Sequence, residues 1–240
     1  MPIESDHRGS DSPYVARVWR GRTSGVDQMT SIATSTWELV FWEQQGVMHA
    51  AVRGPETTAS SAETVGDSES FGITFAHGTS MPHLPIGALV DGGRGSPHVT
   101  ERTFLLRDEE WQIPDFDDAE LLVEKLVRAG VLVRDPLVDE VVWGGAARVG
   151  SRAVQRRVAA ATGLTQGAIR QIERAREAAV LLGARVTALD VVHRLGYYDQ
   201  PHLARSLQRF IGRTATQLRQ PDPTANPLSL LYKPENPAGS

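Results

Sequence analysis

The stretch from Thr187 to Leu218 constrains the fold of this chain more than any other part of the sequence. Apolar residues recur there at helical spacing on both sides of Gly196, which predicts two short helices. Gly196 suits the left-handed residue that ends a helix, and Asp199 suits the N-cap of the next one, with Pro201 in the first turn. The apolar residues are Ala188, Val191, Val192 and Leu195 in the first helix and Leu203, Leu207 and Phe210 in the second. This pattern, with a polar and basic free face on the second helix, is typical of a helix-turn-helix that enters a DNA major groove.

The string GYYDQPHLARSLQRFIG, followed by TATQLR, resembles the signature of the AraC/XylS family of transcription regulators. That signature has a Gly-Tyr/Phe pair, an Asp-Gln-x-His-Leu-x-Arg run, an aromatic residue, a Gly and a final Thr-Pro. The chain departs from it at Leu207, where an aromatic residue is usual, and at Ala215, where Pro is usual. A helical hairpin that only packs a core would need the apolar positions but not the Asp-Gln-x-His-Leu-x-Arg run.

An earlier string, GSRAVQRRVAAATGLT, resembles the first recognition helix of the same family. Gly150 stands where the capping Ser is usual, so Ser151 is the alternative cap. Thr165 then opens a long helix that Gly183 ends, with Ile169, Ile172, Ala175, Ala179 and Leu182 on one face. In the family such a helix joins two helix-turn-helix units, so one chain could enter two successive major grooves about 34 Å apart.

The resemblance implies an α+β fold in which a β-rich domain precedes an all-α DNA-binding domain with two helix-turn-helix units. We expect a disordered lead-in over residues 1–13, a β-rich sensor or dimerisation domain over 14–116, the DNA-binding domain over 117–220 and a Pro-rich tail over 221–240. Asp117 is the expected cap of the first helix of the helical half, three residues before Glu120. Double-stranded DNA and RNA polymerase are the implied partners, and a small-molecule effector and a homodimer remain open.

Side chains on the two predicted reading helices carry the expected DNA contacts. Arginine can bond to guanine O6 and N7, glutamine to adenine N6 and N7, and Pro or Ala can touch a thymine methyl. The expected base-reading residues are Arg152, Gln155 and Arg156 on the first helix and Gln200, Pro201, Ala204 and Arg205 on the second. Phosphate contacts, which position without reading sequence, are expected from Arg157, Arg209 and Arg213. Tyr197 and His202 are expected to be structural.

Charge is divided unevenly along the chain. Residues 136–220 hold 13 Arg, no Lys and 6 acidic residues, whereas residues 1–135 carry a net charge of −10. A basic segment attracts phosphates and an acidic one is repelled by them, although a solvated arginine-rich face would show the same composition. The complete lack of cysteine excludes disulfides, thiolate zinc sites and the thiol chemistry of the alkyl-repair branch of AraC-like proteins. The chain lacks a secretory-type start and any run of about 18 apolar residues, so we expect a cytoplasmic protein without a membrane span.

The first half of the sequence predicts strands at residues 14–19, 36–42, 47–53 and 71–76, with a loop over 56–70 and a short helix near 84–90. The motifs WELVFW, VRGPET and FGITFAHGTSMPHLP resemble, more loosely, the N-terminal regions of some AraC-like regulators. A barrel or sandwich with one mouth could bind a small molecule, or the domain could only dimerise or brace the helical half. His49, His77, His83 and His98 raise a metal site, as in cupins, but lack a His-x-His pair with a following carboxylate, so no metal or other cofactor is expected.

The favoured interpretation is therefore a non-enzymatic, sequence-specific DNA-binding regulator. Two alternatives stay open: a cupin-like metal-dependent enzyme domain fused to a DNA-binding module, and an architectural protein that binds DNA without regard to sequence.

Overall fold

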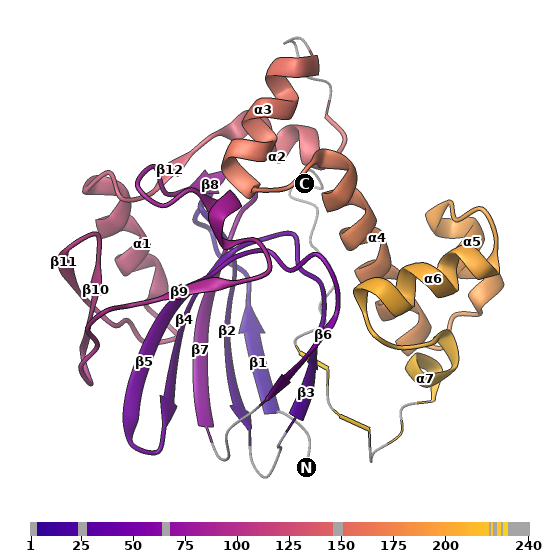
Figure 1. Ribbon diagram of the computed structural model, residues 1–240, viewed down its shortest axis with the longest axis horizontal. Coiled ribbons are helices and arrows are strands. Elements are labelled where there is room, and N and C mark those ends of the chain that lie inside the picture. The colour runs from indigo at the N-terminus through magenta and orange to yellow at the C-terminus, as the bar shows by residue number, and fades with distance from the viewer. Residues whose placement is uncertain are drawn as a thin grey trace. The chain divides into compact units, whose positions relative to one another are not determined.

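The computed structural model describes residues 4–23, 28–63, 68–145, 151–220, 222, 225, 226, 228 and 229. Most strands come before residue 113 and nearly all helices after it, so the expected α+β class is confirmed (Figure 1). The chain forms two compact units. A sheet unit comprises residues 1–26, 36–55 and 65–166, and a helical unit comprises residues 27–35, 56–64 and 167–240. Within the described ranges, no helix is both long enough and apolar enough to cross a membrane.

An open antiparallel sheet of six strands forms the body of the sheet unit (Figure 1). Its order is β1 (Glu4–Arg8), β2 (Val15–Thr23), β7 (Ser68–Phe75), β4 (Glu38–Gln44), β5 (Val47–Arg53) and β9 (Gly93–Gly95). Val18, Ile73, Leu39 and Val52 are register partners across four of these strands and form one apolar row. The sequence left a barrel or a sandwich open for this domain, and in the described residues these six strands form an open sheet with β1 and β9 at its edges.

Two sequence predictions are corrected here. The segment expected to be a disordered lead-in contains β1, which pairs along its whole length with β2. The segment expected to be a loop over 56–70 contains β6 (Ser60–Glu63) and the start of β7. β1 and β6 are polar and do not alternate apolar with polar residues, so their sequences did not indicate that they pair as strands.

The β4–β5 hairpin is tighter than the four-residue connection that the sequence indicated. Gln44 pairs with Val47, which leaves only Gln45 and Gly46 in the turn. Both have positive φ, 53° and 75°, which suits a two-residue hairpin turn whose twist matches that of the strands. The strand over Val47–Arg53 agrees with its predicted bounds.

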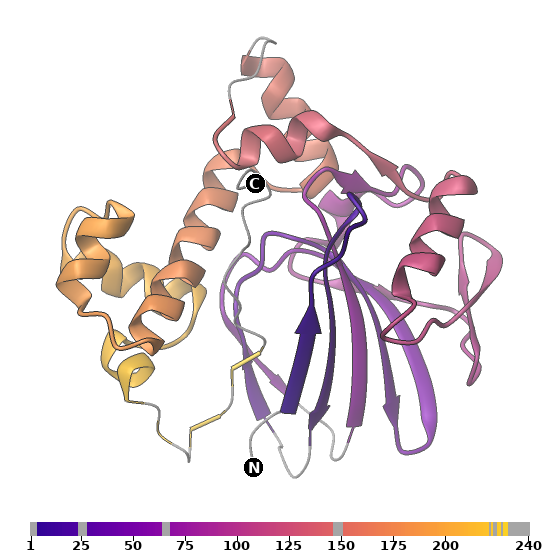
Figure 2. The same ribbon diagram turned by 180° about the vertical axis from the view of Figure 1, so that it is seen from behind.

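One face of the sheet is covered by α1 (Ala119–Arg128), as Figure 2 shows from behind. Leu122, Val123 and Leu126 of this helix share a core with the apolar row of the sheet and with Phe104 of β10 (Thr103–Leu106). Asp118, not Asp117, is the N-cap, and its carboxylate accepts from the Asp115 N–H at 2.7 Å instead of capping the helix. The remaining elements around the sheet are β8 (Thr79–Ser80), η1 (Ile86–Leu89), β10 (Thr103–Leu106), β11 (Glu109–Gln112) and β12 (Val133–Arg134).

Two further helices, α2 (Pro136–Val142) and α3 (Ser151–Thr162), belong to the sheet unit. Asp135 caps α2, since its side chain accepts from the Leu137 N–H at 3.1 Å. Gly163, at φ 71°, follows α3 and approaches η1 so closely that a Cβ there would meet the Gly87 Cα at 2.8 Å. The end of α3 is thus fixed against η1, and the grouping of residues differs from the boundary at 116/117 expected from the sequence.

The helical unit contains α4 (Gln166–Gly183), α5 (Ala188–Leu195), α6 (Gln200–Phe210) and α7 (Ala215–Arg219), together with a ribbon of β3 (Gln28–Ser31) and β6. The expected apolar face of α4 is buried at all five positions. The segments next to the ribbon bond to the end of α6: the Ala33 N–H donates to the Phe210 carbonyl and the Ala59 N–H to the Arg209 carbonyl, both at 2.8 Å. These bonds satisfy carbonyls that a helix C-terminus leaves without partners.

Candidate nucleic-acid interface

Capping residues fix the helix ends around the α5–α6 turn, and Gly196 and Asp199 among them were predicted from the sequence. Thr187 caps α5 by accepting from the Asp190 N–H at 3.2 Å, and Gly196 ends it with φ 66°. Asp199 then caps α6 by accepting from the His202 N–H at 2.7 Å, with Pro201 in the first turn. The two helices are therefore separated by only four residues, Gly196 to Asp199.

One side of α6 is buried and the other is exposed. Leu203, Leu207 and Phe210 face the core, whereas the exposed side carries Gln200, Pro201, Ala204, Arg205, Gln208 and Arg209. These exposed residues repeat at three- and four-residue intervals, so they lie along one face of the helix. All four base-reading residues predicted on this helix are among them.

The inner side of this hairpin is held by polar contacts around Tyr197. Its hydroxyl lies 3.2 Å from Ser206 Oγ, and the Arg174 guanidinium lies 4.5 Å from the centre of its ring. Burial raises the pKa of the Tyr197 phenol above its ordinary value. His202 contacts the same ring edge-on and accepts from the Tyr198 N–H at 3.3 Å through Nδ1. Tyr197 and His202 are thus both engaged inside the helical unit.

On α3, the predicted base-reading residues Arg152, Gln155 and Arg156 are exposed, and Val154 and Val158 are buried on the opposite side. Arg157 is exposed as well, but its guanidinium makes a two-pronged ion pair with Asp135. Hydrogen bonding to this carboxylate raises the pKa of Arg157. Gly150, which stands where the family usually has the capping Ser, lies outside the described residues.

The two remaining phosphate candidates differ in how far their guanidinium groups are engaged. Arg213 donates to the carbonyl of Gly212 at 3.1 Å and to that of Asn226 at 2.5 Å. Arg209 is exposed and lies over the Phe210 ring at 5.0 Å, without an ion pair or hydrogen bond from its side chain to any described residue. Of the three predicted phosphate contacts, Arg209 is therefore the one whose guanidinium could bind a phosphate without first breaking a hydrogen bond or ion pair within the protein.

The structure places the predicted residues in two groups, one on α3 in the sheet unit and one on α6 in the helical unit, except Arg213, which lies in the turn between α6 and α7. Tyr198, to which the sequence prediction gave no role, is 90% exposed in the turn before α6. The Gly-Tyr-Tyr-Asp string thus places a hydroxyl that can donate to a phosphate next to the capped start of this helix.

The histidines of the sheet unit do not form a metal centre in the described part of the chain, which contains no group of three or more metal-binding side chains. His49 stacks on Trp42 with ring centres 5.1 Å apart, and buried His77 contacts Trp143 edge-on at 5.8 Å. His83 is exposed, and its pKa is lowered by partial burial and by the nearby Arg107 charge.

Comparison with known proteins finds no matching family model, no matching curated protein and no matching solved structure. The assignment of function therefore depends on the residues and geometry of the chain itself.

Proposed function

We propose that this chain is a sequence-specific DNA-binding regulator of transcription of the AraC/XylS type. In this proposal α5 and α6 form one helix-turn-helix and α2 and α3 form another, and α3 and α6 each enter a major groove. The observation that carries the proposal is the exposed face of α6, where Gln200, Ala204, Arg205 and Arg209 are all accessible to a duplex.

The side chains on this face suit the two kinds of contact that DNA-binding proteins make, contacts to base edges and contacts to phosphates. Arg205 and Gln200 have the donor groups that recognise guanine and adenine edges, and Pro201 and Ala204 are small apolar surfaces for a thymine methyl. Arg209, one turn further along the helix, is placed to meet phosphate, and exposed Tyr198 adds a hydroxyl donor before the helix. On α3, Arg152, Gln155 and Arg156 have the same chemistry.

Selection of bound duplexes from a random-sequence pool tests the proposal. The full chain at about 150 mM salt is expected to enrich one motif, because base contacts discriminate by about 1–3 kcal/mol for each good pair. A variant with Gln155, Arg156, Gln200 and Arg205 all changed to Ala should enrich no motif, and a variant with Arg128 changed to Ala should enrich the same motif as the original chain. Binding without enrichment, with a steep salt dependence, would instead identify an architectural protein.

A further inference from the structure

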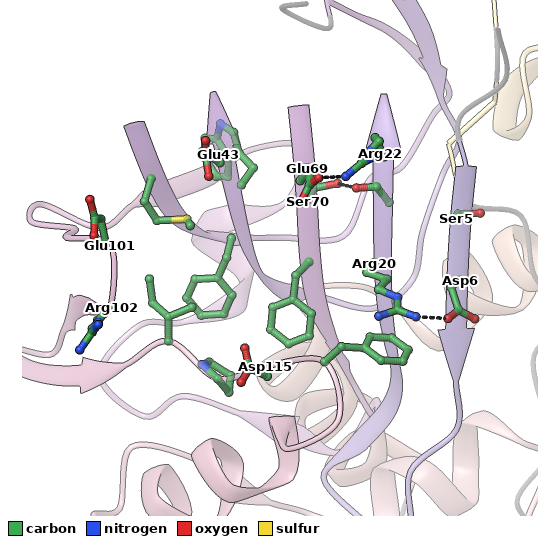
Figure 3. Close-up of a pocket in the computed structure, with 18 of the residues that line it drawn as sticks. Ser5, Asp6, Arg20, Arg22, Glu43, Glu69, Ser70, Glu101, Arg102 and Asp115 are labelled. Atoms are coloured by element: carbon green, nitrogen blue, oxygen red, sulfur yellow. Dashed lines mark hydrogen bonds and ion pairs between the residues drawn. The ribbon is translucent and has the colours of Figure 1, made fainter. Parts of the chain in front are cut away.

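A cavity of about 920 Å³ lies on one face of the six-stranded sheet (Figure 3). It occupies the part of this face that α1 leaves uncovered. Two rows of side chains from neighbouring strands form its floor. One row pairs Phe41, Phe71, Arg20 and Asp6 across β4, β7, β2 and β1, and the next row pairs Met48, Glu43, Glu69 and Arg22 across β5, β4, β7 and β2. These rows share the face that α1 covers further along, because residues two positions apart on a strand point the same way. Phe116, Ile113 and Asp115 close one side of the cavity.

The centre of the floor is aromatic. Phe41 and Phe71 stack with ring centres 5.7 Å apart; Phe41 is buried beneath the floor, and Phe71, which is only partly buried, presents its accessible aromatic surface. The Phe116 ring already has a cation over it, since the Arg20 guanidinium lies 4.5 Å from its centre. Aromatic faces attract cations electrostatically, so this lining favours an apolar ligand that carries positive charge.

The charges around the floor are unbalanced. Five carboxylates line the cavity, those of Asp6, Glu43, Glu69, Glu101 and Asp115, against the three guanidinium groups of Arg20, Arg22 and Arg102. Asp6 and Glu69 are neutralised by ion pairs to Arg20 and Arg22, which Figure 3 shows as dashed lines. The carboxylates of Glu43, Glu101 and Asp115 make no ion pair within the described part of the chain.

Glu43 is the carboxylate that most clearly lacks a positive charge beside it, which a cationic ligand would supply. It lies directly opposite Glu69 on the neighbouring strand, and like charges at such positions repel. Arg22 pairs with Glu69, whereas Met48, the cross-strand neighbour of Glu43 on its other side, offers no charge. A cation seated on the accessible part of the Phe71 ring would lie beside Glu43 and supply the partner charge that Arg22 supplies to Glu69.

We propose that this cavity binds an organic cation with an aromatic or otherwise apolar body, held by the phenylalanine floor and by Glu43, Glu101 and Asp115. An anionic ligand is disfavoured, because two of the three lining arginines already have carboxylate partners. Cation binding stands whether or not the chain reads DNA, because every lining residue belongs to the sheet unit.

Calorimetric titration of the full chain with two ions of the same shape and opposite charge tests this proposal. Tetraphenylphosphonium is expected to bind saturably at one site, more weakly as salt rises, and tetraphenylborate is expected not to bind there. Absence of phosphonium binding, or equal binding of the two ions, would overturn the proposal.

Three variants locate the site. Glu43→Gln should raise the Kd for tetraphenylphosphonium about three- to tenfold, the effect of one nearby charge in a water-exposed cavity. Phe71→Leu, which keeps apolar surface but removes the ring, should raise it about two- to fivefold. Glu124→Gln, on the exposed side of α1 and outside the cavity, should leave the Kd unchanged. Unchanged affinity in both cavity variants, with urea unfolding showing intact folds, would place phosphonium elsewhere and contradict the assignment.

Discussion

Arg205 and Arg209 lie one helical turn apart on the exposed face of α6, yet we expect different roles for them. Arg205→Ala should cost about 1–3 kcal/mol of DNA-binding free energy and relax preference at one base pair, because a bidentate guanine contact is lost. Arg209→Ala should weaken binding to all sequences alike and lower the salt dependence by about one phosphate contact. Titrations of both variants with the selected duplex and with single-base mutants separate these outcomes. If the two variants lost affinity uniformly, the roles assigned here would be wrong.

The ion pair between Arg8 and Glu120 gives a prediction about pH. The Arg8 guanidinium donates to both oxygens of Glu120 at 2.7 Å, and these hydrogen bonds hold the pKa of Glu120 at about 2, below its usual 4.5. The ionised carboxylate therefore stabilises the fold above about pH 4.5, and this contribution is lost as the pH falls towards 2. Glu120→Gln should lower the unfolding free energy at pH 7 by about 1–2 kcal/mol, since both partners are partly buried.

Urea unfolding of the original chain and of Glu120→Gln over this pH range measures the effect, and the difference between them should shrink as the pH falls. Glu124→Gln is the matched control, because Glu124 pairs with Arg128 on the same helix but both side chains are largely exposed. It should cost less than about 0.5 kcal/mol. A pH-independent difference for Glu120→Gln would contradict the ion-pair explanation.

At the scale of elements, the start of α6 depends on Asp199. Its carboxylate satisfies the His202 N–H, one of the donors that a helix start leaves without an intrahelical partner. Asp199→Ala should therefore lower stability by about 1 kcal/mol, whereas Asp199→Asn, which keeps a capping oxygen, should cost only a few tenths. Thermal unfolding of the two variants compares these values. Equal losses would mean that the charge of Asp199, and not its capping bond, is what matters.

Elements with local sequence features could be predicted from the sequence, whereas elements that depend on contacts between distant residues could not. The capped helices α5 and α6 could be predicted because Asp199, Gly196 and the apolar spacing are local features. Polar strands β1 and β6 could not, because only pairing with distant strands makes them strands. The cavity was equally hidden, since Phe41, Glu43 and Phe71 come together only through the register of β4 and β7.

At the scale of the whole molecule, the chain passes repeatedly between its two units. Segments from the first half of the sequence therefore complete the helical unit, and buried Arg176 bonds to one of them. Arg176 lies on α4 and donates to the Ala33 carbonyl at 2.9 Å, so a segment that connects strands of the sheet completes the helical unit. Arg176→Met should lower the stability of this unit by about 1–3 kcal/mol, because a buried hydrogen bond is lost. Amide hydrogen exchange should speed up at Ala33 and Ala59, and the exposed control Arg170→Met should leave both rates unchanged.

The central claim, that α3 and α6 each read bases in a major groove, is tested most directly by methylation interference on the selected duplex. We predict two clusters of guanine N7 positions, about one helical turn apart, at which methylation blocks binding. Arg205→Ala should remove interference in one cluster, and Arg152→Ala together with Arg156→Ala should remove it in the other. Interference at no guanine of a guanine-containing motif, or a pattern that none of these substitutions alters, would contradict the claim.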